Sequence, residues 1–152
     1  MIFVTVGTAQ FDELVMEVDG LVRSGVIRDR VVAQIGRGRY VPTSIEYFRL
    51  ARSLNSAYDH ADVIVSAGGA GTIMECVRRG LRLVVVENRS LMEGHQAQLV
   101  REMARRGHLL WCPSVSEIAE YVERARHMRF EPFVSDPPRA HLLIRDLLRR
   151  PR

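Results

Sequence analysis

The chain has 152 residues, of which 47% are hydrophobic and 26% charged, the size and balance of one soluble globular domain over residues 1–152. No apolar run approaches the roughly 18 residues of a membrane span, and the N-terminus has neither the basic region nor the cleavage site of a signal peptide. The net charge of +4 comes from arginine without lysine, but most arginines alternate with acids, as in residues 28–30, which is typical of a solvated face rather than of a nucleic-acid-binding track.

Short apolar runs alternate with helical stretches along the chain, which predicts a parallel sheet wrapped by helices. In chain order, the expected elements are a strand at Ile2–Val6, a helix at Phe11–Ser24, a strand at Val31–Ile35, a short strand at Tyr47–Ala51, a helix that ends at Tyr58–Ala61, a strand at Val63–Ser66, a helix at Thr72–Arg79, a strand at Leu83–Val86, a helix at Gly94–Arg106, a strand at Leu109–Trp111, a helix at Val115–Arg126 and a final helix at about 138–148. The weakest pattern is that of Tyr40–Ser56. The chain has no repeat and no internal linker, so we expect an α/β fold with a single Rossmann-like, doubly wound parallel sheet.

The most informative stretch is a glycine turn between the strand Val63–Ser66 and the helix Thr72–Arg79, in which three of the four residues 68–71 are glycine. Glycine lets the backbone approach a ligand closely, and the start of a helix presents unpaired N–H groups with about half a positive charge. A diphosphate suits such a site; a tight turn that binds nothing is the alternative. A P-loop is excluded because there is no lysine, and no Gly-x-Gly-x-x-Gly follows the first strand as in a dinucleotide fold.

Glu75 follows the glycine turn by one helical turn. Its carboxylate can accept two hydrogen bonds from a vicinal diol such as a ribose. Alternatively, it is a first-turn acid that only complements the helix dipole. The residues by themselves leave both interpretations open.

Several motifs in a fixed order give the chain a resemblance to a known family. They are Phe3–Thr8, Phe11–Leu14, Gln34–Gly38, Ala61–Ser66, Gly69–Thr72 with Glu75, Leu91–Gln96 with Leu99, and Gly107–Leu109. The chain resembles the glycosyltransferase family 28 C-terminal domain. Within this family it is similar to the cytosolic catalytic subunit of the heterodimeric UDP-N-acetylglucosamine transferase of dolichol-linked oligosaccharide synthesis, and also to small subunits of bacterial exopolysaccharide glycosyltransferases. The match runs to about Cys112 and is looser beyond it.

The resemblance implies the C-terminal, donor-binding half of a GT-B glycosyltransferase, with a UDP-sugar over the carboxyl ends of the strands. The implied donor site comprises Gly7, Thr8, Gly69, Ala70, Gly71, Thr72, Glu75, His95, Gln96 and Gln98. In this arrangement residues 69–72 hold the diphosphate, Glu75 holds the ribose hydroxyls, and Gln96 faces the sugar hydroxyls with help from His95 or Gln98. Residues 7–8 lie at the cleft between the two halves. Arg37 is either a neighbour of this site or a solvated loop cation.

One residue departs from the family pattern. Members usually carry a histidine just before the glycines, where this chain has Ala67. If that histidine donates to a phosphate, its loss costs on the order of 1.5–3 kcal/mol, as for a charged hydrogen bond. The departure puts the turnover rate or the identity of the donor in doubt, but not the fold.

Enzymes of this kind displace UDP by in-line attack of an acceptor hydroxyl, with inversion at the anomeric carbon. The leaving diphosphate must be stabilised and the acceptor deprotonated. The glycine turn would serve the first need without a metal, and no Asp-x-Asp occurs in the sequence, so we expect no metal and no other cofactor. No residue can be assigned as the general base: His95 is a weak candidate, and the base could instead belong to a partner. Cys76 and Cys112 have no metal-ligand spacing, which indicates reduced, intracellular thiols.

The resemblance further implies an N-acetylglucosaminyltransferase active only as a complex. It would add GlcNAc from UDP-GlcNAc in β-1,4 linkage to a polyprenyl-diphosphate-linked GlcNAc during N-glycan precursor synthesis. The partners would be a membrane-anchored subunit that supplies the acceptor half and the lipid-linked sugar acceptor itself. The chain would be cytoplasmic and recruited through the partner to the cytosolic face of a membrane, the endoplasmic reticulum in a eukaryote.

The final helix at about 138–148 is expected to dock to this partner. Its apolar stripe is formed by Leu143, Ile144, Leu147 and Leu148, and the alternative is that the stripe covers the sheet of its own domain. Three other functions stay open: the small subunit of a bacterial exopolysaccharide glycosyltransferase, a non-catalytic UDP-sugar-binding regulatory subunit, and an arginine-rich nucleic-acid binder.

Overall fold

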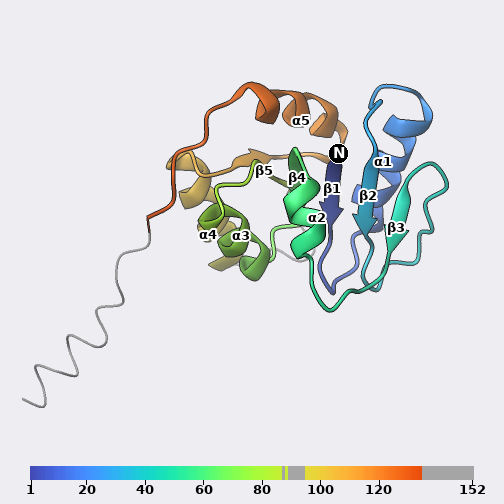
Figure 1. Ribbon diagram of the computed structural model, residues 1–152, viewed down its shortest axis with the longest axis horizontal. Coiled ribbons are helices and arrows are strands. Elements are labelled where there is room, and N and C mark those ends of the chain that lie inside the picture. Colours follow the sequence, from blue (N-terminus) through green and yellow to red (C-terminus); the bar gives the residue numbers. More distant parts are fainter. Residues whose placement is uncertain (87, 89–94, 135–152) are drawn as a thin grey trace, which may run out of the picture.

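The computed structural model describes residues 1–86, 88 and 95–134, with the side chains of residues 95 and 96 left aside (Figure 1). Its elements in chain order are β1 (Ile2–Thr5), α1 (Asp12–Arg23), β2 (Val31–Gln34), β3 (Glu46–Phe48), α2 (Asn55–His60), β4 (Val63–Ser66), α3 (Ala70–Arg78), β5 (Leu83–Val86), α4 (His95–Arg105), β6 (Leu110–Cys112), a 3₁₀ turn (Val115–Glu117) and α5 (Ile118–His127). The final helix predicted at about 138–148 lies outside the described residues.

All six strands form one parallel sheet in the order β3-β2-β1-β4-β5-β6. This is the doubly wound order of the Rossmann fold, so the predicted fold class is confirmed. The chain proceeds outward from β1 in one direction and from β4 in the other. The carboxyl ends of these two central strands therefore lie at the switch point of the topology, with Thr5 opposite Ser66. Ligands of open α/β sheets bind in the crevice at this point.

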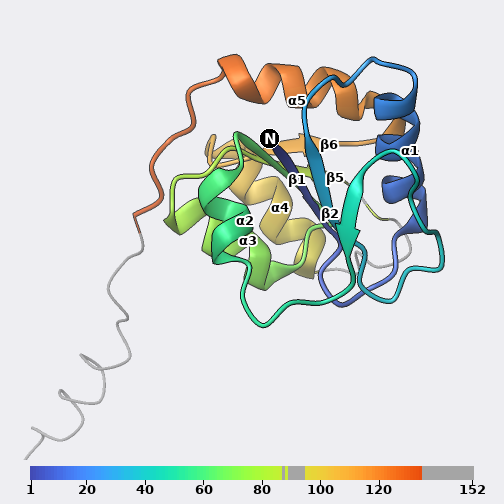
Figure 2. The same cartoon turned by 45° about the vertical axis from the view of Figure 1, so that its right-hand side comes forward.

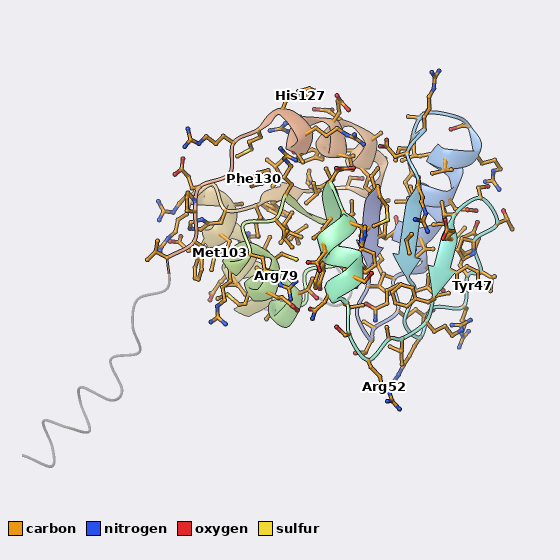
Figure 3. The ribbon with its side chains drawn as sticks, in the orientation of Figure 1. Tyr47, Arg52, Arg79, Met103, His127 and Phe130 are labelled. Carbon is orange, nitrogen blue, oxygen red and sulfur yellow. The ribbon has the colours of Figure 1, made fainter. Side chains whose placement is uncertain are left out.

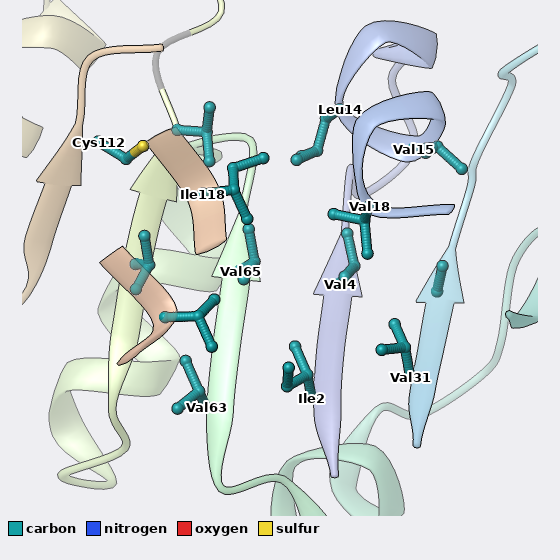
Figure 4. Close-up of a cluster of buried hydrophobic side chains, with 14 of the residues drawn as sticks. Ile2, Val4, Leu14, Val15, Val18, Val31, Val63, Val65, Cys112 and Ile118 are labelled. Atoms are coloured by element: carbon teal, nitrogen blue, oxygen red, sulfur yellow. The ribbon is translucent and has the colours of Figure 1, made fainter. Parts of the chain in front are cut away.

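Helices cover both faces of the sheet, with α1 and α5 on one face and α2, α3 and α4 on the other (Figure 2). Alternate residues of each strand enter the two cores because side chains alternate across a strand. On β1, for example, Ile2 and Val4 pack under α1 and α5, whereas Phe3 packs against the other three helices. Figure 4 shows the first of these cores. Burial on both faces explains why the strands are nearly continuous apolar runs.

The structure moves several predicted boundaries by one residue, as for the last strand, which is Leu110–Cys112, and corrects three of them by more. The strand near Tyr47 is shorter and one residue earlier, Glu46–Phe48. The helix predicted from Thr72 begins at Ala70, because Gly69 already has the extended backbone of an N-cap. The helix predicted from Val115 opens as a 3₁₀ turn, in which the Ser114 hydroxyl accepts a hydrogen bond from the Ser116 N–H.

Residues 128–133 tie the two layers of helices together across the amino edge of the sheet, a feature not predicted from the sequence. After α5, Phe130 packs against the core under α1 and α5, whereas Phe133 packs against the opposite core. The Glu131 N–H donates to the Gly107 carbonyl at 3.0 Å, just before β6. His108 bonds the Glu131 carbonyl at 2.8 Å through Nδ1 and contacts the Phe133 ring edge-on.

Cys76 and Cys112 are buried and free, and they lie in the two different cores. Burial raises the pKa of Cys76 to about 12 and that of Cys112 to about 11. Both thiols are therefore neutral and protected in the folded chain. None of the helices in the described part of the chain is long and apolar enough to cross a membrane.

Candidate functional site

The candidate site lies at the carboxyl edge of the sheet, between the loops that follow β1 and β4. The Ala67 N–H donates to the Thr5 carbonyl at 3.1 Å, so the two loops start side by side. One loop then carries Gly7 and Thr8, and the other carries the glycine turn. The strand order thus brings together two groups of residues that are about sixty positions apart in the sequence.

The glycine turn leads into α3 with an exposed backbone. Gly68 has a φ of +88°, which glycine adopts without strain, and residues 69–71 are exposed. The first helical hydrogen bond is donated by the Ile73 N–H to the Gly69 carbonyl at 3.0 Å. The N–H groups of residues 70–72 therefore have no partner within the helix. No acidic side chain stands in the first turn of α3, so its own residues leave the positive end of the helix dipole uncompensated.

Buried polar side chains hold these two loops in place. Those at the carboxyl ends of the strands, each at most 5% exposed, are Thr5, Gln34, Ser66 and Asn88. The Thr5 hydroxyl donates to the Gln34 side-chain oxygen at 2.7 Å and accepts from the Gly7 N–H at 3.1 Å. The Ser66 hydroxyl accepts from the Gly68 N–H at 3.2 Å. Satisfied hydrogen bonds in a buried setting are strong and directional, so they fix the path of both loops.

The loops after β1 and β2 are packed directly onto each other. Gly36 has a φ of +52°, and a Cβ atom there would lie 2.4 Å from the Ala9 carbonyl oxygen and 2.7 Å from that of Gly7. The Arg37 N–H donates to the same Ala9 carbonyl at 3.0 Å. The rim of the site formed by residues 7–9 therefore depends on a glycine at position 36.

A hollow of about 670 Å³ opens beside this rim, lined by residues 8–13 together with Arg37 and Asn88. Asp12 fixes its wall by accepting hydrogen bonds from the Arg39 N–H and from the Gln10 side chain, both at 2.9 Å. Burial works against the charged form of this carboxyl, but these hydrogen bonds outweigh it and lower the pKa of Asp12 below 3.8. The hollow is thus lined by a carboxylate that is charged at neutral pH and by the exposed side chain of Arg37.

Glu75 lies in the second turn of α3, with its side chain 42% exposed. Because the helix begins at Ala70, the alternative that Glu75 is a first-turn acid is wrong. Its Oε1 atom accepts a hydrogen bond from Arg79 at 2.9 Å. Thr72, one turn earlier, is half-buried.

The residues predicted on α4 are placed only in part. The helix begins at His95 after the carboxyl end of β5, so its first turn lies at the same edge of the sheet as the start of α3. Gln98 is exposed there. The side chains of His95 and Gln96 lie outside the described part, so their contacts with a sugar stay predictions. Among the residues that the structure describes, no group of three or more histidine, cysteine or acidic side chains is placed to hold a metal ion.

Comparisons with known proteins decide the family. The profile of the glycosyltransferase family 28 C-terminal domain matches residues 1–136. The chain belongs to this family. It is 37% identical over 122 residues to the human UDP-N-acetylglucosamine transferase subunit ALG13, a match that covers 73% of the chain but 11% of the relative. The chain therefore spans about a tenth of the length of this relative.

Solved structures agree on the fold. A solution structure of ALG13 superposes with a TM-score of 0.62 at 22% identity, covering 93% of each chain. MurG of Acinetobacter baumannii superposes with a TM-score of 0.60 at 17% identity, covering 96% of this chain and 48% of MurG. The prediction that this family 28 domain has the Rossmann-like fold of a GT-B glycosyltransferase half is thereby confirmed.

Sequence reasoning on the family 28 motifs missed Arg79 and Asn55. The spacing of Glu75 and Arg79, four residues apart, could have indicated their pairing because such residues are neighbours on a helix. Asn55 gave no such signal, since it reaches Arg79 only through the packing of α2 on α3. Arg37 is exposed at the hollow, and its role in donor binding stays a prediction.

Proposed function

We propose that the chain is the donor-binding, catalytic subunit of an inverting UDP-N-acetylglucosamine transferase. It would add GlcNAc in β-1,4 linkage to a polyprenyl-diphosphate-linked GlcNAc. The observation that carries the proposal is the exposed start of α3 at the switch point of the sheet, in a chain that matches family 28 over residues 1–136. The 37% identical human relative is named as a subunit of a UDP-N-acetylglucosamine transferase, and this name supports UDP-GlcNAc as the donor.

The leaving diphosphate is the group that most needs stabilisation. Residues 69–72 would donate backbone N–H groups to it, and the dipole of α3 would favour the charge that develops on UDP. An N-terminal dipole contributes about 0.3–1 kcal/mol to an exposed anion and up to about 2 kcal/mol at a partly buried one. These contributions are small individually, but they add up. Because the N–H groups are already oriented before the reaction, they would stabilise the transition state more than the bound donor.

The remaining donor contacts are assigned by the family resemblance. Glu75 would accept hydrogen bonds from the ribose hydroxyls, and Gln96 would bind the sugar with His95 or Gln98. Residues 7–8 would face the acceptor half across the cleft. These roles would give specificity through hydrogen bonds, because an analogue that lacks one hydroxyl leaves a site group unpaired.

The acceptor half would come from a partner subunit anchored in the membrane, which would recruit this chain to the cytosolic face, of the endoplasmic reticulum in a eukaryote. The human relative is named as a subunit, and a cleft needs two walls. The general base would be His95 or a residue of the partner.

The test is a titration of the full chain with UDP-GlcNAc, UDP-glucose and GDP-mannose by calorimetry, followed by transfer assays with the candidate partner and a polyprenyl-diphosphate-linked GlcNAc. We expect preferential binding of UDP-GlcNAc and transfer only in the complex. Glu75→Ala should weaken UDP binding by roughly 1.5–3 kcal/mol with an unchanged circular dichroism spectrum. A chain that binds no UDP would refute the proposal, and one that transfers GlcNAc at a normal enzymatic rate by itself would refute the need for a partner.

A second candidate, a non-catalytic subunit that only binds a UDP-sugar, is favoured by Ala67. The usual histidine is absent at position 67, between Ser66 and the glycine turn, which would remove one donor to the phosphates. The transfer assay separates the two functions, because a regulatory subunit would bind UDP-GlcNAc without turnover in the complex. Transfer to an exopolysaccharide precursor instead would identify the bacterial alternative.

A further inference from the structure

Arg79, the C-cap residue of α3 that is labelled in Figure 3, links α2 to α3 through hydrogen bonds to Asn55 and Glu75. Its Nη2 atom donates to Glu75 Oε1 at 2.9 Å and to Asn55 Oδ1 at 2.6 Å. Its Nη1 atom lies 3.6 Å from a carboxylate oxygen of Asp59, and the guanidinium stands 5.4 Å from the centre of the Tyr58 ring. One side chain therefore fixes the Glu75 carboxylate against the first turn of α2.

The geometry leaves one oxygen of Glu75 for a ligand. In the described part of the chain, the contact of Arg79 with this carboxylate, which is both a hydrogen bond and an ion pair, goes to Oε1. A carboxylate has two oxygens with about four lone-pair sites, so Arg79 can hold the group while Oε2 accepts from a hydroxyl. The planar, always charged guanidinium keeps its orientation better than a flexible ammonium would.

Stability alone does not require this cluster. An exposed ion pair four residues apart on a helix contributes little to folding, and Arg79 is 33% exposed. Three other partners from α2 nevertheless converge on the same guanidinium. Fixing a rotamer-rich glutamate before a ligand arrives removes an entropic cost from binding.

We propose that Arg79 is a positioning residue that orients Glu75 for the two hydroxyls of a ribose, and so sets the preference for ribonucleoside diphosphates over their deoxy analogues. This inference rests on the proposed function, because it assumes that Glu75 meets the ribose. Asn55 acts through Arg79 by holding the guanidinium from the other side.

The experiment measures the affinity of the full chain for UDP and for 2′,3′-dideoxy-UDP by calorimetry. The variants are Arg79→Met, Glu75→Ala, the double variant, and Asn55→Ala, which keeps the charge of Arg79 but removes one of its anchors. Arg78→Met is the matched control: it removes the same charge from the neighbouring position on α3, and Arg78 makes no ion pair within the described residues.

We expect Arg79→Met to weaken UDP binding about three- to tenfold and to leave dideoxy-UDP binding unchanged, so that the preference for the ribonucleotide falls. Asn55→Ala should give a smaller fall, Arg78→Met none, and the double variant should bind UDP no more weakly than Glu75→Ala. The inference is overturned if Glu75→Ala removes the preference but Arg79→Met keeps it, or if Arg79→Met weakens both ligands equally. If the unaltered chain does not distinguish the two ligands, the ribose role of Glu75 fails first, and the role of Arg79 fails with it.

Discussion

Replacing Gly36 by alanine tests whether the rim of the site depends on direct contact between the loops after β1 and β2. The substitution has two costs. A side chain at a φ of +52° brings Cβ close to its own backbone, which costs roughly 1–2 kcal/mol. The new Cβ would also lie 2.4 Å and 2.7 Å from two carbonyl oxygens, and backbone must move to relieve such contacts, at roughly 1–3 kcal/mol.

Gly25 provides a matched control for the first cost. Its φ is +77°, and no atom lies within 4 Å of the Cβ that alanine would add. Gly25→Ala should therefore lower the free energy of unfolding by roughly 1–2 kcal/mol, whereas Gly36→Ala should lower it by about 2–5 kcal/mol. The difference between the two variants measures the contact between the loops.

Urea denaturation at equilibrium gives both free energies, provided that the two variants share the same slope with denaturant. Gly36→Ala should also weaken UDP binding, because the displaced loop carries residues 7–9, while Gly25→Ala should leave it unchanged. Equal losses of stability in the two variants would refute the close packing of residues 7–9 on Gly36.

Four further predictions can be checked on the same protein. Asp19→Ala should lower the free energy of unfolding, measured by urea denaturation, by about 2–4 kcal/mol. The reason is that this buried carboxylate accepts hydrogen bonds from a tyrosine hydroxyl at 2.7 Å and from two backbone N–H groups of the loop before β3. An unchanged free energy would show that the loop does not depend on Asp19. The free energy of unfolding should fall as the pH rises above about 9. Burial raises the pKa of Tyr58 from 10.0 to about 12, and the pKa values of Cys76 and Cys112 from 9.0 to about 12 and about 11, so the unfolded chain loses these protons at a lower pH than the folded chain. Thermal melts with a constant midpoint from pH 8 to 10.5 would contradict this. Activity of the assembled enzyme should survive EDTA, and a strict need for added magnesium or manganese would count against a metal-free site. Truncation before Pro137 should leave the domain folded by circular dichroism but abolish co-purification with the partner, and retained co-purification would place the docking surface elsewhere.

The strands were predictable because their pattern is local. Val63–Ser66 and Leu83–Val86 are short apolar runs buried on both faces of the sheet, and their bounds in the structure are the predicted ones. The strand Glu46–Phe48 was less certain because it lies at the sheet edge, where two of its three residues are exposed. An exposed edge strand leaves no apolar run to recognise.

The candidate site was predictable only where it consists of consecutive residues. The glycine turn and the start of α3 lie within one stretch, so their residue types indicate their chemistry. The contact of Gly36 with residues 7–9 and that of Asn55 with Arg79 depend instead on which strands and helices are neighbours. Single-sequence patterns carry no information on such pairs, which lie more than twenty positions apart.

Residues 128–134 lie at the amino edge of the sheet, whereas the candidate site lies at its carboxyl edge. Another protein could therefore contact this chain at two separate places. Glu131 pairs beside the start of β6, and the exposed Val134 follows it, whereas the glycine turn lies beyond the opposite ends of the strands. Four-residue strands alone separate these places by about 13 Å. A subunit that engaged both would hold the domain at two points, and such bivalent attachment can be tight even if each contact is weak. It would also fix the angle at which the exposed start of α3 faces that subunit, as a single contact could not.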